Sequence, residues 1–240
     1  MAIKNIVFKS KQYNLSYELL NHTSKESILF LHGWGANKEL MRRAFGGFLN
    51  EYCHIYLDFP GFGNSSAKEP VNSFDVRDIT KEFLCSIGKD PQIIVGHSFG
   101  GKIALLLNPK NIVLLSSSGI VLPKKLWVKI KIKLFKIAKC FGFKGLYRIF
   151  ASKDVKGMDL VMYETFKKVV NEDMSKYFKD YKGRAVIFWG KDDETTPIIA
   201  AHKIASLVKN STLFELQGDH FFFLDKGGFI SEMITEKLKD

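Results

Sequence analysis

The sequence contains few of the residues that build disulfide frameworks or metal centres, with only three cysteines among 240 residues. Their number is odd and their spacing fits no metal site, so we expect buried or neutral thiols in a reducing compartment. No apolar run approaches the length of a membrane span, and the first residues lack the apolar core of a signal peptide. We therefore expect a cytoplasmic protein that holds no metal.

The remaining composition is that of a globular protein. Hydrophobic residues make up 46% of the chain and charged residues 25%, and the length suits a single α/β domain with a substantial core. The formal net charge is +11, and its distribution along the chain is more informative than its total.

Apolar runs typical of strands alternate with amphipathic, helix-like segments through most of the sequence. Two of these runs, 4–8 and 13–20, flank a turn and predict an antiparallel hairpin. The other predicted strands are 27–31, 54–57, 92–96, 111–115, 185–189 and 212–216. The predicted helices are 38–50, 74–88, a short one after the fifth strand, 197–208 and one from about 225. This alternation predicts a mostly parallel sheet, whose ligand-binding residues gather at the carboxyl ends of the strands.

One turn between the predicted strand 92–96 and the following helix has the features of a nucleophile site. It reads Gly96-His97-Ser98-Phe99-Gly100-Gly101. A serine on such a sharp turn has a strained backbone and needs small neighbours, which Gly96 and Gly100 supply. The turn lifts the Ser98 hydroxyl above the sheet, and the start of the next helix presents free amide groups to an oxyanion.

A nucleophilic serine also needs a base, an acid and a second oxyanion donor. His220 and the pair Asp192-Asp193 each follow a predicted strand, as Ser98 does. His220 would take the proton of Ser98 and return it to the leaving group, and an aspartate would orient the imidazole. The amides of Phe99 and Trp34 would bind the oxyanion.

Other polar residues in these segments are given structural roles. Asp58 precedes a Pro-Gly-x-Gly turn, where a carboxylate commonly anchors loop amides. Three further histidines lie in segments predicted as a turn, a strand start or an exposed helix, and we expect them to be solvated or structural: His22, His54 and His202.

Together these strings resemble the α/β-hydrolase family across nearly the whole chain. They read LHGWG, DFPGFGNS, GHSFGG, WGKDDETTP and GDH. The resemblance implies an α/β-hydrolase fold with a mostly parallel eight-stranded sheet, helices on both faces and a helical lid. The order serine, acid, histidine is that of this family. Its acid stands four residues before the proline of the W-G-x-x-D-x-x-x-P pattern, which selects Asp193 over Asp192.

The segment from about 120 to 182 interrupts the alternation and lies where the family carries its lid. We therefore expect a core of 1–119 and 183–240 within one domain. From 123 to 148 the segment has nine lysine and arginine residues and no acidic residue. Its apolar helical face holds Leu126, Ile130, Leu134, Ile137 and Phe141, with Trp127 beside them. Because lids line the acyl pocket, Trp127 and Phe141 become candidate substrate contacts.

The lysines of this segment have three interpretations. They form a solvated face, or they bind an acidic partner such as an acyl carrier protein, or they bind an anionic membrane surface. Nucleic acid is disfavoured because no base-reading motif accompanies the charge.

The sequence thus predicts a cofactor-independent serine hydrolase of a carboxylic ester or similar acyl substrate. The HGWG segment resembles that of pimeloyl-carrier-protein methyl ester esterases, and carboxylesterases in general share the other motifs. A carbon–carbon bond hydrolase of meta-cleavage products is an alternative, although those enzymes usually have asparagine where this chain has His97. A non-catalytic binding module on a hydrolase scaffold is another. A haloalkane dehalogenase is disfavoured, because Ser98 stands where those enzymes have an aspartate nucleophile.

Overall fold

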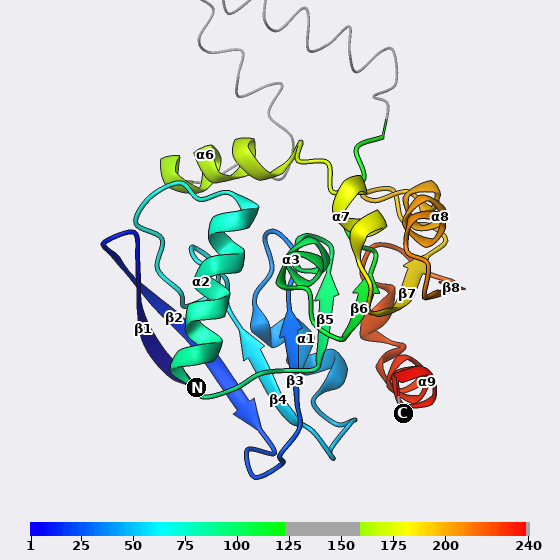
Figure 1. Cartoon of the computed structure of the whole chain (residues 1–240), viewed down its shortest axis with the longest axis horizontal. Helices are drawn as coiled ribbons and strands as arrows, with labels where there is room; N and C mark the ends of the chain where they lie inside the picture. Colours follow the sequence, from blue (N-terminus) through cyan, green and yellow to red (C-terminus); the bar gives the residue numbers. More distant parts are fainter. Residues whose placement is uncertain (123–158, 239–240) are drawn as a thin grey trace, which may run out of the picture.

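The computed structural model describes residues 1–122 and 159–238 (Figure 1). Its centre is an eight-stranded sheet with the order β1-β2-β4-β3-β5-β6-β7-β8. The strands are β1 (Ala2–Phe8), β2 (Lys11–Leu20), β3 (Ser27–Leu31), β4 (Cys53–Leu57), β5 (Ile93–His97), β6 (Asn111–Leu115), β7 (Arg184–Gly190) and β8 (Ser211–Leu216). The first hairpin is antiparallel and β2 pairs antiparallel with β4, whereas all the other pairs are parallel. The predicted α/β-hydrolase arrangement of the sheet is therefore confirmed.

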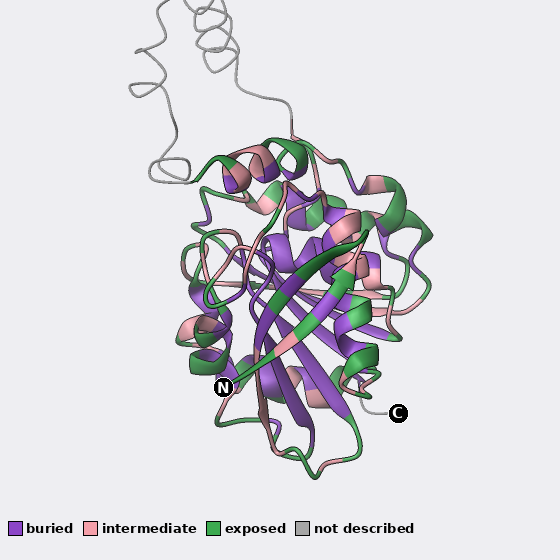
Figure 2. Cartoon of the chain, turned by 90° about the vertical axis from the view of Figure 1, so that its left-hand side faces the viewer, coloured by how far each residue is buried: buried purple, intermediate pink, exposed green. Residues whose placement is uncertain are grey.

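The central strands are buried on both faces, which explains their continuous apolar runs. On one face, Leu29 and Ile94 pack in a core with α2 (Ser73–Ser86), α3 (Phe99–Leu107) and α8 (Ile198–Leu207). On the other face, Ile28 and Val95 pack with α1 (Lys38–Phe45) and α9 (Gly227–Leu238). The alternation of side chains along the central strands thus produces two apolar cores with the sheet between them, and Figure 2 shows these central strands as buried.

The predicted element boundaries hold to within a few residues except at α1. The predicted helix 38–50 ends at Phe45 instead. Gly46 and Gly47 follow directly, and Leu49 adopts a left-handed backbone with φ of 52°. A left-handed residue does not continue a right-handed helix, so the apolar Leu49 belongs to the turn that enters β4.

The described end of the insertion, 159–182, contains two helices and no strand. They are α6 (Leu160–Val169) and α7 (Ser175–Asp180), at the edge of the molecule where the strands end (Figure 1). The two ends of the insertion meet, because the Met174 amide donates to the Gly119 carbonyl at 2.7 Å. The chain therefore leaves and re-enters the core at one place.

Helix α6 is fastened to the core by a buried polar group. Lys102 of α3 is 3% exposed, and its Nζ donates to the Val169 carbonyl at 2.6 Å and lies 3.4 Å from Glu172. Burial lowers the pKa of Lys102, and Glu172 opposes this shift. The Ser73 hydroxyl at the start of α2 also bonds to Glu172. Lys102 and Glu172 thus join α2, α3 and the end of α6.

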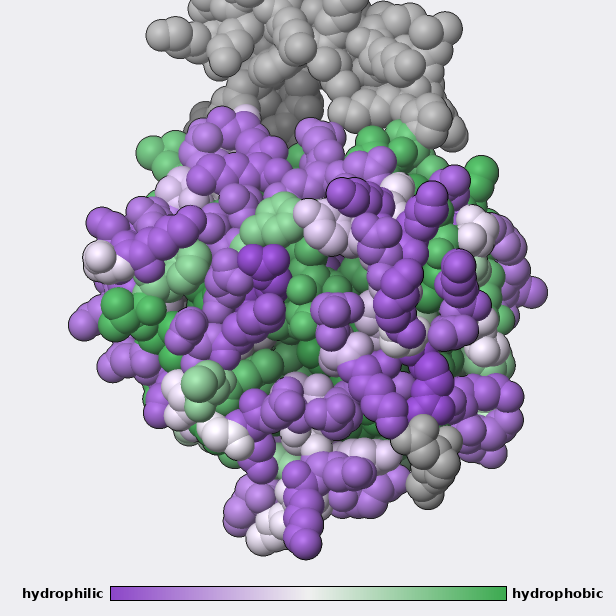
Figure 3. Space-filling view, viewed as in Figure 1, coloured by the Kyte–Doolittle hydropathy of each residue, from purple (hydrophilic) through white to green (hydrophobic). Residues whose placement is uncertain are grey.

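The outer surface is largely polar. Figure 3 shows one face on which hydrophilic side chains surround a hollow with apolar side chains at its floor. A cavity of about 490 Å³ lies between the carboxyl ends of α2 and α3, lined by residues that include Cys85 and Lys110. It opens at the amino ends of β5 and β6, the opposite edge of the sheet from Ser98. None of the described helices is long and apolar enough to cross a bilayer.

Candidate active site

Ser98 occupies a tight turn between β5 and α3. Its backbone has φ of 50° and ψ of −113°, a conformation that is costly for a residue with a side chain. The two neighbouring glycines allow the turn to form. A Cβ on Gly96 would lie 2.4 Å from the Gly100 carbonyl oxygen, and one on Gly100 would lie 2.3 Å from the Leu31 carbonyl oxygen. The sequence therefore places Ser98 in a strained turn that only small flanking residues permit.

The two predicted oxyanion residues lie on either side of this turn. Phe99 is the first residue of α3, where an amide has no acceptor within the helix. Trp34 belongs to the turn after β3, and that turn sits against Ser98, because a Cβ on Gly33 would lie 3.1 Å from the Ser98 Cβ. The Trp34 and Phe99 rings pack edge to face at 5.8 Å. The structure thus brings both predicted oxyanion residues beside the serine.

Asp193 and His220 are in direct contact. His220 Nδ1 lies 2.7 Å from Asp193 Oδ2, and the amides of Thr195 and Thr196 each donate to Asp193 Oδ1 at 2.8 Å. Burial by itself would raise the pKa of Asp193, but the hydrogen bonds from His220 and the Thr196 amide outweigh it, so this pKa lies below its ordinary value of 3.8. The carboxylate therefore stays charged and holds the proton of His220 on Nδ1, which leaves Nε2 as the basic atom.

The neighbouring Asp192 is not in this arrangement. Its carboxylate accepts from the Gln217 side chain at 2.5 Å on the exposed side of the loop. Asp193, by contrast, is 5% exposed and reaches His220. Of the two aspartates, Asp193 is therefore the one that contacts His220.

Thr196 is a site residue that the sequence analysis missed. Its hydroxyl lies 2.8 Å from Asp193 Oδ2, 3.1 Å from the Ser116 carbonyl and 3.3 Å from His220 Nδ1. It therefore ties the acid to the end of β6. The available signal was its position, three residues after the acid and directly before Pro197, where a threonine is suited to close a turn back onto a carboxylate.

Ser98 and His220 lie at the same edge of the sheet and are connected through His97. His97 directly precedes the serine, and its Nε2 donates to the His220 carbonyl at 2.9 Å. Within the described residues no hydrogen bond joins the Ser98 hydroxyl to the His220 ring. Hydrogen bonds of catalytic groups are often long when no substrate is bound, so this geometry is compatible with proton transfer from Ser98 to His220.

Aromatic side chains cover the turn after β3 that holds Gly33 and Trp34, the candidate oxyanion turn. The Trp34 indole packs against Phe62 at 4.8 Å and against Phe166 of α6 at 5.3 Å. Met162, one turn earlier on α6, packs over Gly61. Helix α6 therefore contributes an apolar wall next to Trp34.

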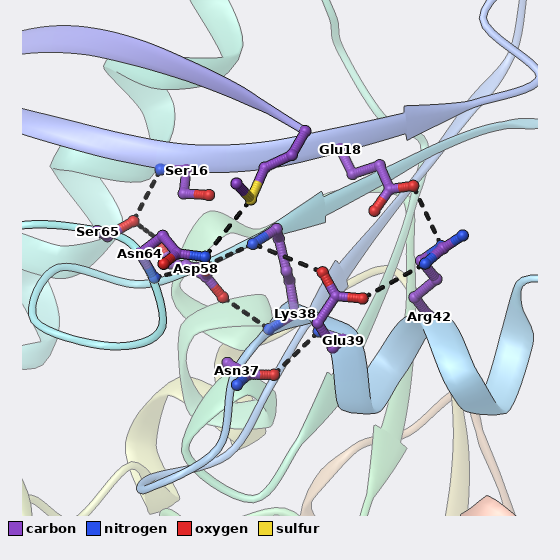
Figure 4. Close-up of polar contacts among 10 residues, drawn as sticks. Ser16, Glu18, Asn37, Lys38, Glu39, Arg42, Asp58, Asn64 and Ser65 are labelled. Carbon is purple, nitrogen blue, oxygen red and sulfur yellow. Dashed lines mark hydrogen bonds and ion pairs between the residues drawn. The ribbon is translucent and has the colours of Figure 1, made fainter.

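Asp58, which the sequence analysis assigned to loop anchoring, lies in a separate and closed network (Figure 4). Its carboxylate accepts from the Lys38 amide and from Lys38 Nζ, each at 2.7 Å, and from the Asn64 amide at 3.0 Å. Its backbone carbonyl accepts from Ser65 Oγ at 2.8 Å. Every contact holds the loop after β4 in place, which agrees with a structural role.

His54 is buried in β4, where its ring bonds to the Tyr56 hydroxyl at 2.8 Å and the Leu49 carbonyl at 2.9 Å, a structural role. The predicted substrate contacts Trp127 and Phe141 lie outside the described residues. Within the residues that the structure describes, no group of His, Cys, Asp or Glu side chains is arranged to hold a metal ion.

The structure resembles a hydrolase from Pseudomonas aeruginosa PA01 with a TM-score of 0.78 and 15% identity, covering 99% of this chain and 98% of that one. It also resembles the esterase EaEST from Exiguobacterium antarcticum with a TM-score of 0.70 and 20% identity, covering 95% and 97% of the two chains. At such identities the likeness shows the fold.

Two sequence relatives agree with this result. The uncharacterized hydrolase YugF of Bacillus subtilis is 23% identical over 94% of both chains. A putative esterase/lipase 2 from Mycoplasma pneumoniae is 26% identical over 42% of this chain and 38% of its own length. The sequence model of the alpha/beta hydrolase family matches residues 28–231, which is most of the chain. This chain therefore belongs to the alpha/beta hydrolase family.

Proposed function

We propose that this protein is a cofactor-independent serine hydrolase that cleaves carboxylic esters through an acyl-enzyme. The observation that carries the proposal is the Asp193–His220 contact of 2.7 Å at the same edge of the sheet as the strained Ser98 turn. An acid that fixes an imidazole and a serine held in a strained turn are the two halves of a nucleophile–base pair.

The reaction would proceed in two stages, formation of the acyl-enzyme and its hydrolysis. His220 Nε2 takes the proton of Ser98 Oγ as that oxygen bonds to the ester carbonyl carbon. The resulting oxyanion is bound by the amides of Phe99 and Trp34, each contributing on the order of 3 kcal/mol. The proton then passes from His220 to the leaving alcohol as the carbon–oxygen bond breaks. In the second stage His220 takes a proton from water, whose oxygen bonds to the acyl carbon. The proton then returns to Ser98 Oγ as the bond between that oxygen and the acyl carbon breaks, which releases the carboxylic acid product.

The experiment is hydrolysis of p-nitrophenyl esters, from acetate to octanoate, by the wild type and by Ser98→Ala. The expected result is turnover by the wild type and a loss of about 10⁴-fold or more in the variant. Ser118→Ala is the matched control, because its hydroxyl lies 3.2 Å from the Ser98 carbonyl, and it should retain turnover within about tenfold. Equal turnover by Ser98→Ala and the wild type would overturn the mechanism.

The finer assignments extend this proposal. A carrier-linked methyl ester as substrate, with an acidic carrier protein as partner, is supported by the HGWG turn and by the basic composition of 123–148. Reversing the charge of several lysines in that segment should weaken turnover of a carrier-linked ester and spare a small one. Equal loss on both substrates would contradict the carrier assignment.

A further inference from the structure

His97 lies at the centre of the site although the proposed mechanism does not use it. Its side chain is 1% exposed and sits among the loops that carry the oxyanion turn, the nucleophile and the base. Its ring stands 4.6 Å from the ring of His220 and 4.7 Å from that of Phe223. A polar ring buried at this point needs a structural or functional reason.

The hydrogen bond of His97 determines its proton position. Its Nε2 faces the backbone carbonyl of His220 at 2.9 Å, and a carbonyl only accepts, so Nε2 carries the proton. The other nitrogen, Nδ1, is buried without a hydrogen-bond partner among the described residues. The ring therefore acts as a neutral donor that is directed at the backbone of the proposed base.

The charge state agrees with this assignment. Burial lowers the pKa of His97 from its ordinary 6.5 to about 3, and His220 and His32 shift it in the same direction. The hydrogen bond to the His220 carbonyl and the charge of Asp193 oppose the shift. His97 thus stays neutral and adds no charge next to the proposed base.

The unbonded edge of the ring faces the oxyanion turn. A Cβ placed on Gly33 would lie 2.8 Å from His97 Nδ1 and 3.1 Å from its Cε1. No backbone strain is involved at Gly33, so the absence of a side chain there serves the close approach of this ring. The Nδ1–Cε1 edge of the imidazole therefore limits the position of the oxyanion turn, while Nε2 limits the position of the loop that carries His220.

We propose that His97 is a positioning residue that sets the distance between the nucleophile turn and the His220 loop. It does so through its hydrogen bond to the His220 carbonyl. Its contact with Gly33 holds the oxyanion turn at the matching distance. This inference rests on the proposed serine mechanism, since the geometry it maintains is that of Ser98 and its base.

The test is a pair of substitutions that differ in one group. In His97→Gln the amide nitrogen occupies nearly the place of Nε2 and still donates, whereas His97→Met has similar length and volume and no donor. The expected result is that His97→Gln keeps kcat within about fivefold, while His97→Met lowers kcat on a p-nitrophenyl ester by about 30- to 100-fold with little change in KM. A misplacement of about 1 Å produces a loss of this size.

A second measurement needs no substrate. The His220 Nδ1 proton bonded to Asp193 should give a slowly exchanging proton NMR signal in the wild type and in His97→Gln, and a broadened or missing one in His97→Met. If the wild type hydrolyses no ester but this signal follows the pattern, the proposed function fails and the positioning role stands. If the ester is hydrolysed and the signal and kcat are the same in the Gln and Met variants, the positioning role fails.

The Gly33 contact is tested by a double-mutant cycle. Gly33→Ala should lower kcat in the presence of His97, because the new methyl group pushes the ring. In the background His97→Ala the same change should cost at least about fivefold less, because the ring is gone. Equal costs in the two backgrounds would overturn the contact. Thermal denaturation of each variant completes the test, since a loss of kcat that tracks a loss of folded protein would make His97 merely structural.

Discussion

Two buried carboxylates follow strands of the same sheet and have partners at the same distance, yet they serve different purposes. Asp58 lies 2.7 Å from Lys38 Nζ, and both side chains are at most 1% exposed. Asp193 lies 2.7 Å from His220 Nδ1, and the histidine side chain is 12% exposed. Hence neither burial of the acid nor contact distance distinguishes an anchoring pair from a reactive one.

The partner makes the distinction. The contacts of Asp58 hold the loop after β4, and the positive charge of Lys38 is neutralised by the Asp58 carboxylate (Figure 4). His220 uses Nδ1 for the contact with Asp193, and the proposed mechanism uses its second ring nitrogen, Nε2, for proton transfer. A carboxylate becomes part of a reactive site when its partner has another titratable atom that is still available.

Breaking the reactive pair should give the largest effect. Asp193→Asn would leave the shape of the site and remove the charge that fixes the His220 proton, so kcat for a p-nitrophenyl ester should fall by about 10⁴-fold. The midpoint of thermal unfolding should change by only a few degrees. Asp192→Asn is the matched control, because its carboxylate bonds to Gln217 on the exposed side rather than to His220, and it should stay within a few-fold of the wild type. A larger loss in Asp192→Asn would reverse the assignment of the acid.

Breaking the Asp58–Lys38 pair should instead lower the stability of the fold. Asp58→Ala would leave Lys38 charged and buried, so the free energy of unfolding in urea should fall by about 3–5 kcal/mol. Glu236→Gln removes an exposed ion pair with Lys237 outside this network, and it should change stability by about 0.5 kcal/mol or less. An unchanged urea midpoint in Asp58→Ala would show that the network contributes nothing.

Acid titration should weaken folding through the buried histidines, and His32 and His97 have the lowest pKa values among those that the structure describes. Burial lowers the pKa of His32, whose Nε2 accepts from the Phe59 amide, to about 4 and that of His97 to about 3. Both ionise near pH 6.5 in the unfolded chain, so between pH 6.5 and about 4 the unfolded state binds more protons and folding is weakened as pH falls.

The measurement is urea denaturation at several values between pH 7.5 and 4.5. The slope should approach about 1.4 kcal/mol per pH unit for each histidine. His97→Gln should remove one of the two contributions. A stability that is flat over this range would contradict both low pKa values.

A third polar anchor should show the smallest effect. Lys102→Met would remove the donor to the Val169 carbonyl, while Glu172 would keep its contact with Ser73, so a loss of about 1–2 kcal/mol is expected in urea denaturation. Lys167→Met on the exposed side of α6, which removes a surface pair with Glu164, should cost about 0.5 kcal/mol or less. Equal effects of the two changes would show that burial of Lys102 contributes nothing.

The sequence predicted the sheet and the turn of Ser98 because their signals are local. Strand periodicity, the glycines around Ser98 and the W-G-x-x-D pattern each span a few residues, and geometry follows directly from them. The prediction of 38–50 as one helix was wrong, since the apolar pattern continued past the glycines that end it at Phe45.

The missed features depend on contacts between distant segments. Asp58 was correctly interpreted as an anchor, but its partner Lys38 lies twenty residues earlier, and no periodicity links them. The Thr196 hydroxyl contacts the Ser116 carbonyl, which is eighty residues away in the chain. Such partners become visible only when the strands are placed side by side.

The meeting of the insertion ends at Gly119 and Met174 has a consequence for how this protein can diversify. Because the entry and exit points are hydrogen-bonded to each other, the chain between them forms a closed loop on the scaffold. The entropic cost of such a loop grows only with the logarithm of its length. The scaffold therefore tolerates segments of different length and composition between these two points without any change to the sheet.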